Sequence, residues 1–319
     1  MKIDQTIFNQ FINNNFLFEK KPKIAVAVSG GPDSMALVFL LNNWIKKNKG
    51  NLIALIVNHN LRSESVKESK FVKKYLLDCK IKAKILAISK TKIKKNNMHE
   101  ARLNRFNMLN YYCMRNDILH LFFAHHKDDN LETFFIRKIA GSNIDGLKGI
   151  QKKIIFNKII FLRPMLMYSK KDIVSYNKKN NILFVNDPSN VNLKYTRIKV
   201  REFLIKNQLM KSVIQKDFDK INKLYPFYKK MIYQILNILI IRISQKVIVI
   251  NSIKLFNHDQ SIQVQIIEII LNFLSKKNKP IRSLKIINCT NQLHSKKYLR
   301  MNFSNVYIEK SKKFINFSN

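Results

Sequence analysis

Residues 23–45 have the sequence KIAVAV SGGPDS MALVFLLNNWI, and this stretch decides the fold. The first six residues are apolar and rich in valine and isoleucine, which favours a strand buried on both faces. The last eleven are mostly apolar with no Gly or Pro, so they predict a buried helix. Between them, residues 29–34 are small and polar and contain two adjacent glycines. A strand, a tight turn and a helix in this order predict a parallel α/β sheet covered by helices on both sides.

The same alternation continues outward from this stretch as far as residue 140. Further strands are predicted at 52–57, 84–88 and 120–124, with helices at 34–47, 64–79, 99–115 and 130–140. A hairpin is predicted at 153–162, followed by helices at 170–179 and 195–207. We therefore expect a doubly wound parallel sheet in a catalytic domain of residues 1–212.

The remaining residues, 213–319, are expected to form a smaller, mainly helical accessory domain. A charged stretch near 210–220 suggests the boundary, although the pattern there is weak. Helical patterns occupy 224–241 and 261–274, and residues 306–309 have a strand-like composition. No cluster of catalytic residue types stands out in this half of the chain.

Lys and Arg number 59 against 20 Asp and Glu, which gives a formal net charge of +39. This excess attracts polyanions and predicts a nucleic-acid partner, although an A/T-rich coding bias accounts for part of it. The apolar run at 235–241, which Asn237 interrupts, is far short of the roughly 20 residues that span a membrane. The first residues, MKIDQ, lack the pattern of a secretory signal, and Cys79, Cys113 and Cys289 form no paired motif. We therefore expect a cytoplasmic protein without a disulfide framework or an iron–sulfur cluster.

The turn at 29–34 has the features of an anion-binding site. Two glycines after a strand let the backbone approach an anion closely, and the first turn of the following helix offers free amides and a positive dipole end. The alternative is an ordinary strand–helix turn, in which glycine merely supplies a positive φ. The chain has six glycines in all where average usage would give about 22, and two of them lie side by side here. No Lys-Ser/Thr pair follows, so the turn is not a Walker-type P-loop.

A second polar segment, HHKDDNLET at 125–133, follows the fourth predicted strand. If a helix begins here, Asp129 and Glu132 project from one face, and together with Asp33 they suit Mg²⁺ or a substrate ammonium group. The alternative is that Asp129 and Glu132 form a D-x-x-E capping box with no role in chemistry. Two adjacent histidines, His125 and His126, favour the functional interpretation.

The turn SGGPDS resembles the signature of the PP-loop ATP pyrophosphatases. The wider pattern of motifs resembles the tRNA(Ile)-lysidine synthase family of that group. Seven motifs in order carry this resemblance: SGGPDS (29–34), NHNLR (58–62), EARLNRF (100–106), HHKDDNLET (125–133), GLKGI (146–150), RPML (163–166) and NDPSN with two following arginines (186–201).

The resemblance implies a reaction in two steps. ATP would adenylate the C2 oxygen of the wobble cytidine in a tRNA(Ile) with a CAU anticodon, and free L-lysine would then displace AMP to give lysidine. ATP and Mg²⁺ would be required. The roles implied for the residues are nucleotide binding by Ser29, Gly30, Gly31, Pro32, Asp33, Ser34 and Arg105; metal binding by Asp33 and Asp129; catalysis by Asp33, His125, Asp129 and Glu132; and RNA binding by Arg102, Arg197 and Arg201.

This sequence departs from the family pattern at two positions. Asn58 stands where the family often has Asp, which excludes a catalytic carboxylate there, and Ile198 follows Arg197 where Asn is common. Rival interpretations are a tRNA thiolase, a non-catalytic RNA-binding protein and an amide-forming ligase acting on a small acid. The sequence does not decide between a monomer and a homodimer.

Overall fold

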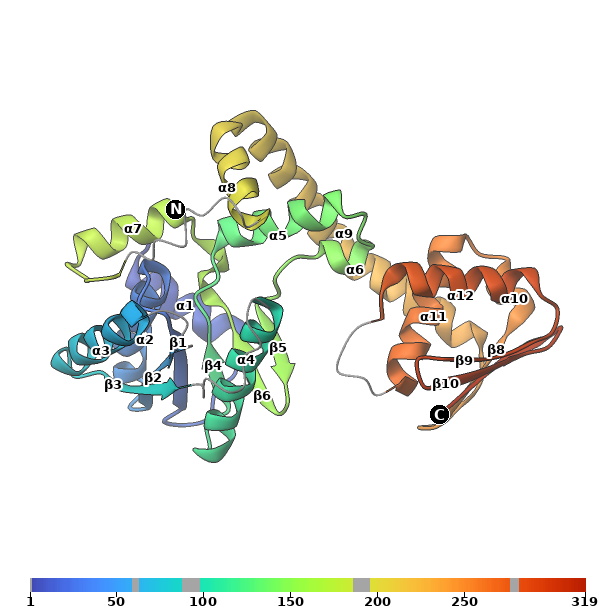
Figure 1. Ribbon diagram of the computed structural model, residues 1–319, viewed down its shortest axis with the longest axis horizontal. Coiled ribbons are helices and arrows are strands. Elements are labelled where there is room, and N and C mark those ends of the chain that lie inside the picture. The colour runs from blue at the N-terminus through green and yellow to red at the C-terminus, as the bar shows by residue number, and fades with distance from the viewer. Residues whose placement is uncertain (1, 59–62, 88–97, 186–195, 276–280) are drawn as a thin grey trace. The chain divides into compact units, whose positions relative to one another are not determined.

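The structure is a computed structural model that describes residues 2–58, 63–87, 98–185, 196–275 and 281–319. The chain forms two compact units. Unit 1 comprises Met1–Arg137 and Gly149–Gln215, and unit 2 comprises Lys138–Lys148 and Lys216–Asn319. The division after Gln215 falls inside one continuous helix, α9 (Gln208–Leu239), so no loop separates the units there (Figure 1).

Unit 1 is built on a six-stranded sheet with the order β3-β2-β1-β4-β6-β5. Its strands are β1 (Lys23–Val28), β2 (Asn51–Asn58), β3 (Lys82–Ala87), β4 (His120–Phe122), β5 (Lys153–Phe156) and β6 (Ile159–Leu162). All neighbouring pairs are parallel except β5 and β6, which form the predicted antiparallel hairpin at the edge. The predicted parallel α/β sheet is confirmed.

Helices cover both faces of this sheet because its strands are apolar on both sides. Alternate residues of β1 point to opposite faces. Ile24, Val26 and Val28 join a core with α1, α2, α3 and α7. Ala25 joins a second core with α4 on the other face (Figure 1). The helices of unit 1 are α1 (Gln5–Asn15), α2 (Pro32–Lys47), α3 (Ser63–Asp78), α4 (Met98–Arg115), α5 (Lys127–Ile139), α7 (Lys170–Lys179), α8 (Thr196–Lys206) and the start of α9, with a short 3₁₀ helix, η2 (Pro164–Met167).

Unit 2 packs helices against an antiparallel sheet of order β7-β8-β11-β10-β9. Its elements are α6 (Ile144–Leu147), the rest of α9, β7 (Ile240–Ile243), β8 (Val247–Asn251), α10 (Ser252–Phe256), α11 (Gln260–Ser275), α12 (Ser283–Ser295), β9 (Leu299–Phe303), β10 (Val306–Lys310) and β11 (Phe314–Ser318). Its core joins the last turns of α9 to α11, α12 and the inner face of the sheet. The unit contains more helix than strand, as predicted. Of the five strands in its sheet, the sequence pattern indicated one, β10.

Two of the sequence motifs fall largely outside the described residues. These are NHNLR after Asn58 and the NDPSN segment. No helix in the described part of the chain is long and apolar enough to cross a membrane.

Candidate active site

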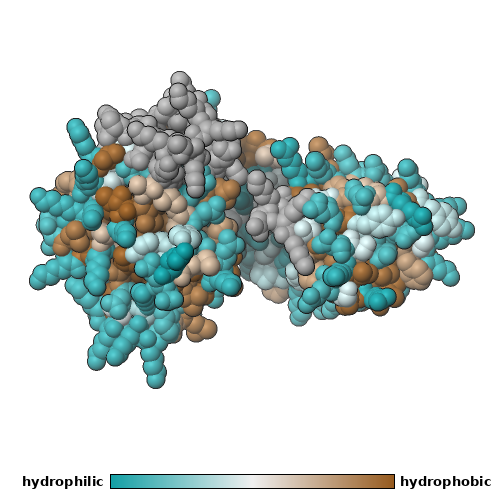
Figure 2. Space-filling view, turned by 60° about the horizontal axis from the view of Figure 1, so that its bottom comes forward, coloured by the Kyte–Doolittle hydropathy of each residue, from teal (hydrophilic) through white to brown (hydrophobic). Residues whose placement is uncertain are grey.

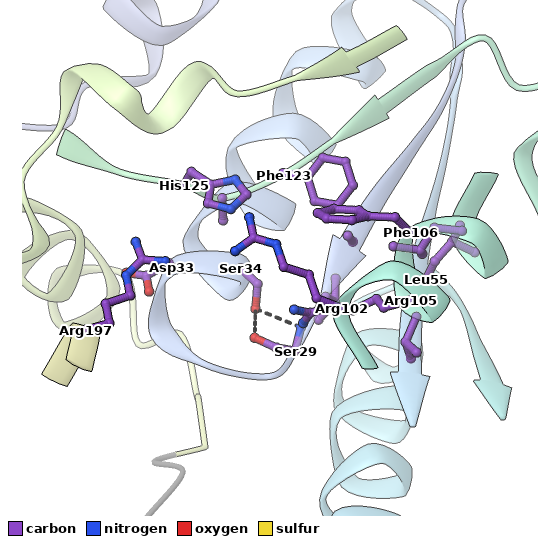
Figure 3. A pocket seen from close by; sticks show the side chains of 15 residues that line it. Ser29, Asp33, Ser34, Leu55, Arg102, Arg105, Phe106, Phe123, His125 and Arg197 are labelled. Carbon is purple, nitrogen blue, oxygen red and sulfur yellow. Dashed lines mark hydrogen bonds between the residues drawn. The ribbon is translucent and has the colours of Figure 1, made fainter. Parts of the chain in front are cut away.

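The SGGPDS turn forms a tight loop between β1 and α2. Gly31 is the N-cap of α2 and Pro32 its first residue, a position at which the missing proline N–H has no helical partner to lose. The Ser34 hydroxyl donates to the Gly31 carbonyl at 3.0 Å and accepts from the Ser29 amide at 3.2 Å. The Ser29 and Ser34 hydroxyls lie 3.3 Å apart (Figure 3). These bonds fold the loop back on itself at the carboxyl end of β1.

Two neighbouring segments hold this loop in place from outside. Gly30 has φ +86°, and a Cβ there would lie 2.7 Å from Val72 Cγ2, so the position requires glycine. The Val185 amide donates to the Gly30 carbonyl at 2.9 Å. From α7, the fully buried Asn177 side chain donates to the Pro32 carbonyl at 2.8 Å. The loop is therefore fixed by contacts with α3, α7 and the segment after α7.

A pocket of about 230 Å³ opens beside the loop at the carboxyl ends of β1, β2 and β4 (Figure 3). Its apolar wall comes from the strands and from α4, including Leu55, Val57, Phe106, Leu109 and Phe123. Its polar lining comes from Ser29, Asp33, Ser34, Arg102, Arg105, His125 and Arg197. An apolar wall next to hydroxyls, loop amides and guanidinium groups suits a ligand with a flat ring and an anionic tail.

The second predicted segment lies at the carboxyl end of β4, the neighbour of β1 in the sheet. Helix α5 begins at Lys127, so Asp129 lies in its first turn. The Asp129 amide donates to His126 Nδ1 at 3.3 Å, and the His126 amide donates to the Asp129 carboxylate at 3.0 Å. The cap is therefore formed by His126 and Asp129. The alternative prediction of a capping box from Asp129 to Glu132 is wrong, because the helix starts before Asp129.

Glu132 is buried, and both of its carboxylate oxygens bind arginines from α8. Arg201 Nε donates to Oε1 at 2.6 Å, while Arg197 Nε donates to Oε2 at 2.7 Å. Arg197 also binds the Asp129 carboxylate at 2.8 Å. The structure thus brings Asp129 and Glu132 together, as predicted, and pairs them with Arg197 and Arg201, which the sequence had not placed beside them.

Asp33 and Asp128 bind lysines that follow later in the chain. The Lys170 ammonium contacts both oxygens of Asp33, at 2.7 and 2.6 Å. Asp128 accepts from the Lys211 ammonium and from the Lys170 amide, each at 2.8 Å. Burial raises the pKa of Asp128, but these two bonds outweigh it and hold the pKa below its usual value. Burial raises the pKa of Asp129 too, but neighbouring His126 and the Arg197 guanidinium outweigh it and hold the pKa of Asp129 below its usual value.

His125 lies at the wall of the pocket, and its Nδ1 is buried without a partner. Burial lowers the pKa of His125 to about 3; the Asp129 carboxylate opposes this shift, while Arg163, Arg102 and Arg197 add to it. The imidazole is therefore neutral at physiological pH. Burial, with Arg102 nearby, also lowers the pKa of Arg105.

The carboxylates at this edge suit Mg²⁺ as part of a shared site. Mg²⁺ in nucleotide enzymes uses one or two carboxylates together with substrate phosphates. Asp33, in the SGGPDS loop, lines the pocket. His126 Nε2 lies 3.9 Å from the Asp33 carboxylate and 3.5 Å from the Asp129 carboxylate. Within the described residues no group of three or more acidic, histidine or cysteine side chains forms a complete metal cage. A metal at this edge would therefore need most of its ligands from a bound substrate and from water.

Sequence reasoning missed the partners of the acidic residues. These partners are Lys170, which binds Asp33, and Lys211, which binds Asp128. Two further residues of the site were also not predicted: Asp128 itself, and Arg163, whose guanidinium is buried over the Phe123 ring. Arg163 is the first residue of the RPML motif, but the sequence alone assigns no role to this arginine. For Lys170 the local signal is weak, because it is one lysine in the pair Lys170-Lys171 of a lysine-rich chain.

Comparisons with known proteins agree with this architecture. The family model described as the PP-loop domain matches residues 1–208. The tRNA(Ile)-lysidine synthase of Orientia tsutsugamushi (strain Boryong) is 41% identical over 189 residues, which cover 59% of this chain and 42% of that protein. The enzyme of the same name from Rickettsia bellii (strain OSU 85-389) is 33% identical over 279 residues, covering 86% of this chain and 64% of that protein. The chain thus spans roughly half the length of the curated relatives it matches.

Among solved structures, the U34-tRNA thiolase NcsA from Methanococcus maripaludis, with its 4Fe-4S cluster, shares the fold. It has a TM-score of 0.55 at 16% identity and covers 68% of this chain and 78% of its own. At that identity the likeness concerns the fold alone. The family match, which spans well over half of the chain, shows that this chain belongs to the PP-loop domain family.

Proposed function

We propose that this chain is a cytoplasmic ligase that attaches L-lysine to C2 of the wobble cytidine of a tRNA(Ile) with a CAU anticodon. ATP would adenylate the tRNA, with release of pyrophosphate, and lysine would then displace AMP. The proposal is carried by one observation: a single pocket joins the SGGPDS loop to the end of β4 and to arginines from α4 and α8. The match of residues 1–208 to the PP-loop domain and the similarity of the chain to tRNA(Ile)-lysidine synthases support it.

In this proposal the SGGPDS loop binds the polyphosphate of ATP and the apolar wall of the pocket binds its adenine ring. The first amides of α2, together with the Ser29 and Ser34 hydroxyls, would hold the polyphosphate, because helix N-termini stabilise anions. The apolar wall with Phe106 would contact the adenine ring, and Arg105 would reach the phosphates from α4. Charge that develops on the α-phosphate is then met by groups already fixed in position, which lowers the barrier.

Mg²⁺ bound by Asp33 and Asp129 would supply further neutralisation of the phosphate charge. Of the two carboxylates, Asp33 lines the pocket, whereas Asp129 is tied to Arg197. Asp33 is therefore the first ligand in this proposal.

Lysine attack requires a neutral amine, although an alkylamine with a pKa near 10.4 is mostly protonated at neutral pH. Asp33 and Asp129 would bind the cationic groups of lysine, while Glu132 would act indirectly by holding Arg197 at the pocket. His125 is a neutral imidazole able to accept a proton, but its pKa of about 3 makes it a weak base in the free pocket. A bound phosphate would offset the surrounding arginines and raise that pKa.

Residues 213–319 are proposed to bind the body of the tRNA, with Arg102, Arg197 and Arg201 nearer the reacting nucleotide. The net charge of +39 supports a polyanionic substrate. Hydrophilic side chains also cover much of the face shown in Figure 2.

A thiolase is the weaker alternative on chemical grounds. Sulfur transfer needs a reactive thiolate, whose formation a low thiol pKa favours. Burial raises the pKa of Cys113 to about 12 and that of Cys289 to about 11. The third cysteine, Cys79, is half-buried in unit 1.

The deciding experiment incubates the chain with ATP, Mg²⁺, labelled lysine and a CAU-anticodon tRNA. We expect label in the RNA together with pyrophosphate release, and Asp33→Ala should abolish both. A tRNA with a different anticodon is the control substrate. Pyrophosphate release without lysine in the RNA would refute the proposed reaction.

A further inference from the structure

Lys170 occupies the carboxylate that the proposed function gives to a metal. Its ammonium lies 2.7 and 2.6 Å from the two oxygens of Asp33, a contact between residues 137 apart in the sequence. Asp33 is a residue of the SGGPDS loop and lines the pocket. A cation attached to the protein thus lies where a free cation would bind.

This ion pair differs from the others at the site in how easily it can open. Glu132 is 2% exposed and is held on both oxygens by rigid guanidinium groups. Lys170 is 43% exposed and Asp33 is 26% exposed, and a lysine side chain is a flexible stem with a single charged end. Exposed pairs of this kind are worth about 1 kcal/mol or less, so a competing charge can open this one.

The backbone of Lys170, in contrast, is fixed. Its amide donates to Asp128, whose other oxygen binds Lys211, and Lys170 is the first residue of α7. The same helix reaches the loop through Asn177 and Pro32. The ammonium can therefore move from Asp33 toward the loop while its attachment point stays in place.

Each of the four carboxylates of the site is paired with a cation in this arrangement. Asp33, Asp128, Asp129 and Glu132 each contact at least one of the four cationic side chains Lys170, Lys211, Arg197 and Arg201. A metal ion arriving alone has to displace one of these cations. A polyphosphate arriving with the metal offers the displaced cation a new anionic partner.

We propose that Lys170 is an exchangeable counter-ion of Asp33, which keeps divalent cations off this carboxylate until the polyphosphate of a nucleotide draws the ammonium away. The inference rests on the proposed use of ATP and adds an order to it: metal and nucleotide bind together. Lys170 thereby acts as a positioning residue for both.

The test measures Mn²⁺ binding to the full chain by electron paramagnetic resonance, without nucleotide. Lys170→Met removes the charge and keeps the stem, so Mn²⁺ should bind about threefold more tightly than to the wild type. Lys171→Met, an exposed neighbour on the same helix, is the matched control and should leave the affinity unchanged. In the double variant Asp33→Asn, Lys170→Met the gain in Mn²⁺ affinity should disappear, because the carboxylate that binds the ion has been removed. Fluorescence of Trp44, the one tryptophan of the chain, reports whether each variant is folded.

The second arm measures ATP binding in the presence of a chelator. Here Lys170→Met should bind ATP about threefold more weakly, because the phosphates lose a cation. Unchanged or weaker Mn²⁺ binding by folded Lys170→Met would overturn the proposal that Lys170 competes with a metal ion for Asp33. Unchanged ATP binding would overturn the proposal that the Lys170 ammonium moves to the polyphosphate. Failure of the proposed function has a separate signature: the wild type would transfer no lysine to tRNA, while both binding results would still hold.

Discussion

The SGGPDS loop and the acidic turn at 125–132 lie at the ends of neighbouring strands, yet they are held by different forces. The loop is shaped by hydrogen bonds among its own six residues and by the space that Gly30 leaves for Val72. The acidic turn is held by cations 65 to 83 residues away in the sequence. We therefore expect the loop to lose its conformation when a side-chain atom is added at Gly30. We expect the acidic turn to be destabilised when one of its charges is removed.

The largest effect is expected at Glu132. Glu132→Gln keeps the shape but leaves Arg197 and Arg201 without their buried carboxylate, and breaking a buried ion pair is strongly destabilising. We expect the free energy of unfolding of unit 1 to fall by about 3 kcal/mol. Urea unfolding followed by the fluorescence of Trp44, which is buried in the first core of unit 1, measures it.

Asp128→Asn is the matched control, since Asp128 is more exposed and pairs with a lysine. Its cost should stay near 1 kcal/mol. Equal losses in the two variants would contradict the distinction between a buried and an exposed pair.

A smaller effect is expected at Gly30. Gly30→Ala places a Cβ 2.7 Å from Val72 Cγ2 at a φ of +86°, so the loop has to shift. The strain should cost about 2 kcal/mol and weaken ATP binding correspondingly, measured by calorimetry.

Gly141→Ala separates backbone strain from the clash. Gly141 has φ +65° and nothing within 4 Å of a Cβ, so the change in the free energy of unfolding of this variant gives the backbone strain alone. If Gly30→Ala bound ATP as the wild type does, the loop would not be the phosphate site.

A further effect concerns the pH dependence of stability and His125, which belongs to the acidic turn. The folded pKa of about 3 lies below the unfolded value near 6.5, so between these values the unfolded chain binds one more proton. Stability therefore falls as pH falls through this window, by up to about 1.4 kcal/mol per pH unit. His125→Asn should reduce that slope in urea unfolding between pH 7 and pH 5, and parallel slopes for the two proteins would contradict the assignment.

The contrast between loop and turn also explains what could be predicted from the sequence. The loop is a local motif, and β1 and β2 are continuous apolar runs, so both were located to within a residue. The acidic turn was found, but its capping was misassigned, because His126 is an unusual N-cap and Asp129 a common one. The pairing of Asp33 with Lys170 was not predicted, since nothing in one sequence indicates which of many lysines lies near a given carboxylate.

The lack of a local signal also explains why most strands of the unit 2 sheet could not be predicted from the sequence. β7 follows α9 directly, and the apolar run at 235–241 continues across the junction without a glycine or proline. The helical pattern was therefore extended to 241, two residues into the strand. Short strands such as β9, with half-buried alternate residues, carry little signal until their partners are known.

Arg163 places a buried positive charge over the ring of Phe123, which lines the pocket, while its own Nη1 donates to the Gln151 carbonyl. It is 6% exposed, its Nε has no partner, and burial with Arg102 nearby lowers its pKa to about 10, so it stays charged at neutral pH. Folding has already stripped most of the water from this guanidinium. The charge of Arg163 therefore acts on an anion in the pocket from behind Phe123, and the guanidinium loses no further water when that anion binds.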